Sequence, residues 1–498
     1  MRPNAITQTW VRGLLLLLFV ITAAGCQQVL QPAPARAPST VQLTPCQLAS
    51  SDASVHLAAR CGKMTVYENR AAQSGRQIDL NLAVIPAISR NPAPDALFLI
   101  AGGPGDSATR SFVVLFSAFR QENEKRDIVL VDQRGAGDSH RLDCPAESDS
   151  EDAAAVRAWA ADCVKRLDAD LRFYTTMDAI GDLDQVRAAL GYPQVNLYGV
   201  SYGTRVVQAY MARYPDRVRT ATLDGVVSPD RPIGLTVSTD AQRALDLIFA
   251  RCAADPACHD AFPDPAGDLA ALLARVDQAP ATVTVDDPVT GKPTPVTLTR
   301  SKLASTIQLY SYAPETAALI PLLLRAARAS NDFTRFASQW LYLSSQLGDI
   351  STPMHDSVLC AEDVPYYGEI SAATVDAEKR GYLGPSFTEL AQLCQAWLVT
   401  PVPAEFKRSV TSTVPTLLLS GEADPITPPA NAEQVAAHLS SSLQLVAPGE
   451  GHSIIIRGCV YKLVARFIEQ GTVQGLATDC VQEIKPMPFF LSFTGTAP

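Results

Sequence analysis

Short apolar runs alternate with amphipathic stretches along most of the chain. The strand-like runs lie at residues 78–85, 96–100, 128–131, 195–198, 220–223 and 416–419. Helical patterns fill residues 176–190 and 202–214, and Gly191 is expected to end the first of these helices. Apolar strands that alternate with helices predict a mostly parallel sheet with helices on both faces, which is a doubly wound α/β fold.

The interval between the last two of these strands follows a different pattern. Amphipathic helices are expected at 239–253 and 316–329, with the second kinked or restarted at Pro321, and a β-hairpin is expected at 281–298. In a doubly wound sheet the ligand lies beyond the carboxyl ends of the strands, so an insertion there would cover it. We therefore expect a lid domain. The predicted domains are a first core part at 46–228, the lid at 229–410 and a second core part at 411–498.

Composition narrows the functional classes. The chain has 498 residues, of which 47% are hydrophobic and 18% charged, as expected of a globular protein. Its net charge of -10, with no basic block, argues against a nucleic-acid partner. The sequence contains no phosphate-binding loop, dinucleotide fingerprint or clustered metal-ligand spacing, so no cofactor and no metal is predicted.

The first 26 residues have the pattern of a targeting segment. Arg2 and Arg12 provide positive charge, and the apolar run at 13–20 is too short to span a membrane. Small residues that end at Cys26 resemble a bacterial lipoprotein signal, in which that cysteine is acylated. Residues 27–45, rich in Pro and Ala, would be a tether. The expected location is the bacterial cell envelope, lipid-anchored in the periplasm or at the cell surface, and ordinary secretion is the alternative.

The remaining cysteines agree with an oxidising compartment. Eleven cysteines less Cys26 leave ten, an even number. We expect each to pair with its neighbour in sequence, although sequence alone does not fix the connectivity. The expected pairs are Cys46 with Cys61, Cys144 with Cys163, Cys252 with Cys258, Cys360 with Cys394, and Cys459 with Cys480.

The most informative motif is Gly-Val-Ser-Tyr-Gly at residues 199–203. It follows a predicted strand and opens a predicted helix, which is the setting of a nucleophile elbow, and Ser201 is the expected nucleophile. The oxyanion of an acyl-transfer reaction would then be bound by the backbone N–H of Tyr202 and by that of Gly103, in the loop after an earlier strand.

In this fold the acid and the base follow the nucleophile along the chain. His452 lies in a glycine-rich loop after a predicted strand at 443–446 and is the expected base. Asp224 and Asp424 each end a predicted strand, and we prefer Asp424 because it is nearer to His452 in chain order and Pro425 fixes its turn. Its expected role is to hold the imidazole tautomer and stabilise the imidazolium.

Four motifs together resemble a known family. They are Gly-Gly-Pro-Gly at 102–105, Asp-Gln-Arg-Gly-Ala-Gly-Asp-Ser at 132–139, the elbow, and Gly-Glu-Ala-Asp-Pro-Ile-Thr-Pro at 421–428. They resemble the proline iminopeptidase and tripeptidyl aminopeptidase group of α/β-hydrolases, and the similarity spans roughly residues 60–480. The segment with Cys459 and Cys480 is typical of the secreted tripeptidyl aminopeptidase branch. Asp132 and Arg134 are expected to brace the sheet beside the oxyanion loop.

This resemblance implies a serine aminopeptidase that releases short N-terminal units from peptides through an acyl-enzyme on Ser201. The units would be single residues, proline among them, or tripeptides. Such an enzyme needs a carboxylate in the lid to bind the substrate ammonium group, and Glu362 and Asp363 are the candidates, with a solvated acidic turn as the alternative. Two other functions remain open: a carboxylesterase or lipase on the same fold, and a non-catalytic lipoprotein that binds at the envelope.

Overall fold

The computed structural model describes residues 39–145, 152–347, 349–368, 370–385 and 387–494. The predicted signal peptide, Cys26 and most of the predicted tether lie outside these ranges. Within them, no helix is both long and apolar enough to cross a membrane.

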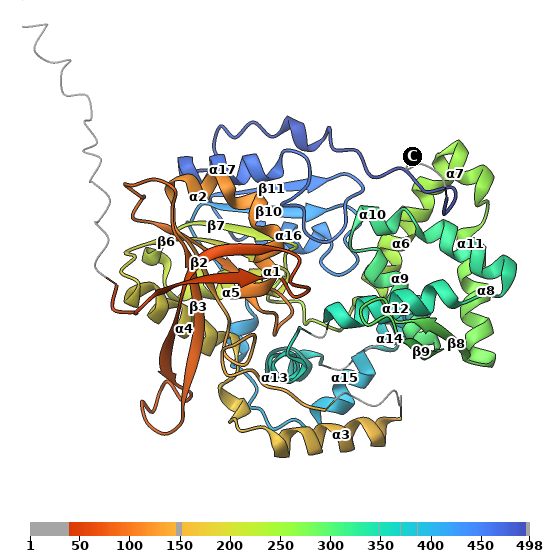
Figure 1. Cartoon of the computed structure of the whole chain (residues 1–498), viewed down its shortest axis with the longest axis horizontal. Helices are drawn as coiled ribbons and strands as arrows, with labels where there is room; N and C mark the ends of the chain where they lie inside the picture. Colours follow the sequence, from red (N-terminus) through yellow and green to blue (C-terminus); the bar gives the residue numbers. More distant parts are fainter. Residues whose placement is uncertain (1–38, 146–151, 348, 369, 386, 495–498) are drawn as a thin grey trace, which may run out of the picture. The chain divides into compact units, whose positions relative to one another are not determined.

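A nine-stranded sheet forms the centre of the fold (Figure 1). The strands run in the order β1-β2-β3-β5-β4-β6-β7-β10-β11. The pairings from β5 to β11 are parallel, and those among β1, β2, β3 and β5 are antiparallel. The bounds are β1 Thr44–Ala49, β2 His56–Tyr67, β3 Gln77–Ile85, β4 Ala96–Ile100, β5 Ile128–Val131, β6 Val195–Val200, β7 Val218–Asp224, β10 Thr416–Gly421 and β11 Ser442–Ala447.

The central parallel strands of this sheet are buried on both faces. In β4, Phe98 and Ile100 belong to one hydrophobic cluster, whereas Leu97 and Leu99 belong to another. Successive side chains of a strand point to opposite faces, so each cluster fills one side of the sheet. The predicted mostly parallel α/β sheet is therefore confirmed.

Helices cover the sheet and, from β4 onward, separate its strands along the chain. The helices of this part are α1 Ala108–Leu115, α2 Arg120–Lys125, α3 Ala153–Arg166, α4 Thr176–Ala189, α5 Tyr202–Arg213, α16 Pro429–Ala436 and α17 Val460–Gln470. Helix α5 packs against β6 and β7, and α16 packs against β10 and β11. Gly191 follows α4 with a φ of 82°, the left-handed conformation that glycine adopts readily at a helix end.

Between β7 and β10 the chain forms a mainly helical insertion, residues 225–415. Its helices are α6 Val237–Ala254, α7 Pro256–Ala261, α8 Pro265–Gln278, α9 Arg300–Tyr310, α10 Pro314–Ala317, α11 Ile320–Ser330, α12 Thr334–Leu347, α13 Thr352–Glu362, α14 Ala372–Arg380 and α15 Phe387–Cys394. The predicted hairpin forms from β8 Ala281–Asp286 and β9 Pro293–Leu298. The expected restart at Pro321 is also present, because Pro321 lies in the first turn of α11.

A separate hydrophobic cluster fills the insertion, to which α6, α8, α9, α11 and both hairpin strands contribute, together with Phe489 near the C-terminus. All five predicted disulfides are present. They join Cys46 to Cys61, Cys144 to Cys163, Cys252 to Cys258, Cys360 to Cys394, and Cys459 to Cys480. Five disulfides indicate an oxidising, extracellular compartment.

Candidate catalytic site

Ser201 occupies a strained turn between β6 and α5. Its backbone has φ 55° and ψ -126°, a conformation that costs a non-glycine residue about 1–3 kcal/mol. The flanking glycines make the turn possible. A Cβ on Gly199 would lie 2.4 Å from the carbonyl oxygen of Gly203, and a Cβ on Gly203 would lie 2.4 Å from that of Ile100. The geometry is that of a nucleophile elbow.

The glycine-rich loop after β4 lies against this serine. A Cβ on Gly102 would be 3.0 Å from the Cβ of Ser201, so the loop could not approach as closely with any larger residue. Gly103, Ser201 and Tyr202 line one cavity. The two residues expected to donate oxyanion hydrogen bonds thus lie on the same cavity as the expected nucleophile.

His452 and Asp424 meet beyond the carboxyl ends of the strands. Nδ1 of His452 lies 2.9 Å from Oδ2 of Asp424. The hydroxyl of Thr427 donates to the same carboxylate oxygen at 2.7 Å and lies 3.0 Å from His452 Nδ1. The other carboxylate oxygen accepts the backbone N–H groups of Ile426 and Thr427 at 2.9 and 2.8 Å. Four contacts therefore fix the orientation of the Asp424 carboxylate.

The electrostatics of the pair favour an ionised acid and a basic imidazole. Burial alone opposes charge on Asp424, yet the neighbouring imidazole and the hydrogen bonds lower the pKa of this carboxyl below its usual value. Burial likewise works against the imidazolium, but attraction to Asp424 outweighs it and raises the pKa of His452. The pair can accept a proton on the imidazole without transferring it to the aspartate.

The insertion contacts both members of this pair. The backbone N–H of His452 donates to the carbonyl of Tyr312 at 2.8 Å, and the two rings lie edge to face at 5.1 Å. Arg243, on α6, donates to the carbonyls of Glu422 and Asp424 at 2.9 Å each. The insertion therefore helps to hold the two loops that carry His452 and Asp424.

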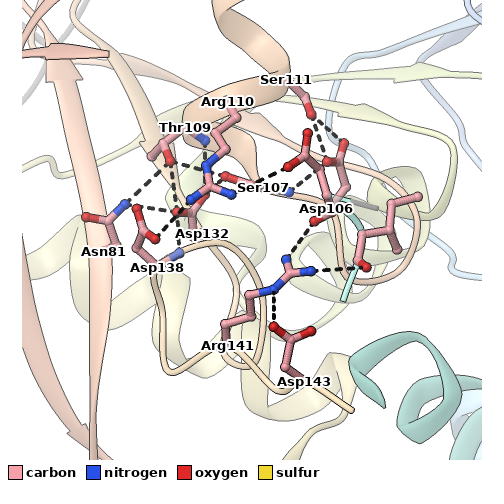
Figure 2. A network of polar contacts seen from close by, with 12 residues as sticks. Asn81, Asp106, Ser107, Thr109, Arg110, Ser111, Asp132, Asp138, Arg141 and Asp143 are labelled. Atoms are coloured by element: carbon pink, nitrogen blue, oxygen red, sulfur yellow. Dashed lines mark hydrogen bonds and ion pairs between the residues drawn. The ribbon is translucent and has the colours of Figure 1, made fainter. Parts of the chain in front are cut away.

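Asp132 anchors the helix that follows the glycine-rich loop. Figure 2 shows its carboxylate among Asn81, Ser107 and Thr109. Its Oδ1 accepts the Ser107 hydroxyl at 2.9 Å and the Thr109 N–H at 3.0 Å, so it satisfies donors at the start of α1. Arg134 is fully buried and makes a two-point ion pair with Asp182 on α4. These contacts agree with the bracing role expected from the motif.

The structure does not bring Glu362 and Asp363 to the cavity beside Ser201. Both side chains are fully buried at the end of α13. Glu362 accepts from the N–H and the hydroxyl of Thr176 at 2.6 and 2.8 Å, and Asp363 pairs with Arg205 and Lys407. Neither the proposed ammonium-binding role nor a solvated acidic turn fits these carboxylates, because their oxygens are already occupied and water does not reach them.

A different carboxylate lines that cavity. Asp240, near the start of α6, faces it together with Arg231 and apolar residues that include Val227, Ile233 and Ile426. Oδ2 of Asp240 accepts from Thr236 at 2.9 Å and from Arg231 at 3.3 Å. Burial raises the pKa of this carboxyl, and the Arg231 guanidinium opposes the increase.

Sequence reasoning missed Asp240, Thr427, Tyr312 and Arg243. Thr427 lies three positions after Asp424, so the local turn could have suggested it. The other three lie in the insertion, whose packing against the core no motif specifies. Among the described residues no cluster of His, Cys, Asp and Glu has the arrangement of a metal site.

Comparisons with known proteins agree with this architecture. Residues 95–251 match the family model described as the alpha/beta hydrolase fold, and residues 381–480 match the model described as TAP-like protein. The serine protease Hip1 of Mycobacterium tuberculosis is 26% identical over 88% of this chain and 91% of its own length. A tripeptidyl aminopeptidase of Streptomyces coelicolor is 34% identical over 34% of this chain and 36% of its own.

Among solved structures, the proline iminopeptidase of Mycobacterium smegmatis aligns with a TM-score of 0.39 at 18% identity, over 82% of this chain and 98% of that one. The fold and the family models together define the chain as an α/β-hydrolase. Within that class, the C-terminal match and these relatives make the chain similar to the proline iminopeptidase and tripeptidyl aminopeptidase group.

Proposed function

We propose that this protein is a serine aminopeptidase that removes short N-terminal units from peptides. The observation that carries the proposal is the contact of His452 with Asp424, formed beyond the strand ends where the strained elbow presents Ser201. The family relationship supports peptides as substrates, since the relatives are named as a serine protease and a tripeptidyl aminopeptidase.

In the proposed reaction Ser201 Oγ attacks the scissile carbonyl carbon while His452 takes the hydroxyl proton. The negative charge that develops on the carbonyl oxygen is stabilised by the N–H groups of Gly103 and Tyr202, each worth about 3–4 kcal/mol in the transition state. The imidazolium, stabilised by Asp424, gives its proton to the leaving amine. Water, deprotonated by His452, then hydrolyses the acyl-enzyme on Ser201.

For the substrate ammonium group we propose Asp240 as the recognition residue. It supplies a carboxylate among the residues that line the cavity of Ser201, and its contacts with Thr236 and Arg231 both use Oδ2, so the ammonium group would bind Oδ1. The neighbouring apolar residues would accept the first side chain of the peptide. The ammonium group and the carboxylate would form charge-assisted hydrogen bonds, which are roughly twice as strong as neutral ones.

Two measurements on the purified protein test the proposed class. A fluorophosphonate should label the wild type and not Ser201→Ala, and peptide naphthylamides with a free amino terminus should be hydrolysed. Hydrolysis of p-nitrophenyl esters without any of the amides would instead identify an esterase. Absence of labelling in the folded wild type would point to a non-catalytic binding protein.

The role of Asp240 is tested with paired substrates that differ only in N-acetylation. Asp240→Asn should raise KM for the free peptide and leave the acetylated peptide, already a poor substrate, unchanged. Asp246→Asn is a matched control, because Asp246 is an exposed residue of the same helix. Equal effects of Asp240→Asn on both substrates would exclude the assignment.

We also propose that the protein is anchored to a bacterial membrane through a lipid on Cys26. The proposal is based on the apolar run and the small residues before that cysteine. Palmitate labelling of cells that produce the wild type, compared with Cys26→Ala, tests it. Release of unlabelled wild-type protein into the medium would favour ordinary secretion.

A further inference from the structure

The other strand-end aspartate, Asp224, has an unusual set of contacts. Asp224 is completely buried at the end of β7. Its backbone carbonyl accepts the N–H of Ser201 at 2.9 Å. Its side chain accepts from the hydroxyl of Ser453 at 2.7 Å and from the N–H groups of Ile454 and Ile455 at 2.9 and 3.1 Å. One residue therefore binds both the elbow and the loop that follows His452.

The loop that Asp224 binds is under backbone strain. Ser453, directly after His452, has a φ of 66°, which is unfavourable for a residue with a side chain. Strain of this kind costs about 1–3 kcal/mol and persists only where surrounding contacts enforce it. Here the contacts come from Asp224, whose carboxylate accepts hydrogen bonds from the Ser453 hydroxyl and from the next two backbone N–H groups.

The position of the carboxylate is itself fixed. Tyr198, on β6, donates its hydroxyl to Oδ2 of Asp224 at 2.7 Å. Gly225 follows, and a Cβ there would lie 2.9 Å from Cε1 of His452, so the imidazole ring packs directly over this turn. The end of β7 thus packs against the imidazole ring and hydrogen-bonds the residues that directly follow His452.

We infer that Asp224 is a positioning residue that holds the His452 imidazole in register with Ser201. Asp424 orients the ring through Nδ1, whereas Asp224 fixes the main chain after the ring and, through its own carbonyl, the main chain of the nucleophile. The inference rests on the proposed function. It gives separate roles to Asp224 and Asp424, which the sequence alone left as alternative candidates for the acid.

The test compares Asp224→Asn with a matched buried aspartate. Asp95 lies directly before β4, at the amino end of that strand, and is also buried and hydrogen-bonded to Arg126 and Asn196. Both substitutions should lower the melting temperature. Well below that temperature, Asp224→Asn should lower kcat by about 100-fold with KM within about threefold, because small displacements of catalytic groups have effects of this size. Asp95→Asn should leave kcat unchanged.

Variants of Ser453 provide a second measurement, which remains possible even if Asp224→Asn does not fold. Ser453→Ala should lower kcat, whereas Ser453→Gly, which adopts the same φ without strain, should retain more activity.

The inference is overturned if Asp224→Asn and Asp95→Asn have equal kcat in their folded fractions. It is also overturned if Asp224→Asn abolishes turnover while Asp424→Asn retains it, because Asp224 would then be the acid. Failure of the wild type itself to react with a fluorophosphonate would refute the proposed function instead.

Discussion

Arg205 and Asp363 are joined by two parallel hydrogen bonds of 2.7 and 2.8 Å, and both side chains are fully buried. Arg205 lies in the first turn of α5, the helix that follows Ser201, and Asp363 lies at the end of α13 in the insertion. The pair therefore fastens the insertion to the helix that carries the elbow. Bidentate pairs of this type combine charge with fixed geometry.

We predict that Asp363→Asn strongly destabilises the protein, since it leaves the buried Arg205 without its full counter-charge. Breaking a buried ion pair by removing one partner costs roughly 3–5 kcal/mol. Denaturant unfolding of the purified variant measures the loss. Glu405→Gln is the control, because Glu405 pairs with Arg408 at the exposed surface at 3.9 Å and should cost no more than about 1 kcal/mol. Similar losses in both variants would contradict the prediction.

The pH dependence of kcat/KM should report His452. The imidazole must be neutral to accept the proton of Ser201, and Asp424 raises the pKa of His452 above 6.5 despite burial. Activity should therefore fall as the pH decreases through a value above 6.5. Asp424→Asn should reduce kcat by roughly ten-thousandfold and move the remaining acid limb to lower pH, since the negative charge is removed. An unchanged acid limb in that variant would show that another group titrates.

A third prediction concerns the second glycine of the elbow. Gly203→Ala should cost several kcal/mol and abolish fluorophosphonate labelling, because its Cβ would lie 2.4 Å from a backbone oxygen that cannot move freely. Gly291→Ala is the comparison. Gly291 has a φ of 68°, but no described atom lies within 4 Å of the position that an added Cβ would take, so only the backbone strain of about 1–2 kcal/mol is added. Labelling should persist there.

Local motifs were sufficient to predict the core of the fold, the strained turn at Ser201 and the contact between Asp424 and His452. The elbow, the glycine-rich loop and the Asp424 turn are each specified by a few consecutive residues, because a strained or tight turn restricts which residues fit. The disulfide pairs were also predicted correctly, since each joins cysteines that are close in sequence. Strands β1 and β2 were not predicted, because β2 has no regular alternation of buried and exposed positions.

The roles of the acidic residues in the insertion could not be predicted in the same way. Glu362 and Asp363 are two acidic residues in succession. These two residue types alone do not show whether the carboxylates bind substrate or form ion pairs inside the protein. The difference is made by Arg205, which is 158 positions away from Asp363. Asp240 was overlooked for the same reason, since only the packing of α6 against the core brings it to the cavity of Ser201.

Glu122 on α2 gives a prediction about stability rather than catalysis. It is buried, and neither carboxylate oxygen accepts a hydrogen bond from another described residue. Burial therefore raises its pKa to about 8. Between the ordinary pKa of 4.5 and this value, the folded protein holds a proton that the unfolded chain has released.

The stability due to this group is accordingly complete below pH 4.5 and is lost as the pH rises to about 8, at roughly 1.4 kcal/mol per pKa unit. Glu122→Gln has the shape of the protonated acid and carries no charge. We expect it to match the wild type in denaturant unfolding at pH 5 and to exceed it by a few kcal/mol at pH 9. Glu124→Gln, an exposed neighbour on α2, should change stability by less than about 0.5 kcal/mol at either pH. A wild type as stable as Glu122→Gln at pH 9 would mean that the carboxylate finds a partner or water when it ionises.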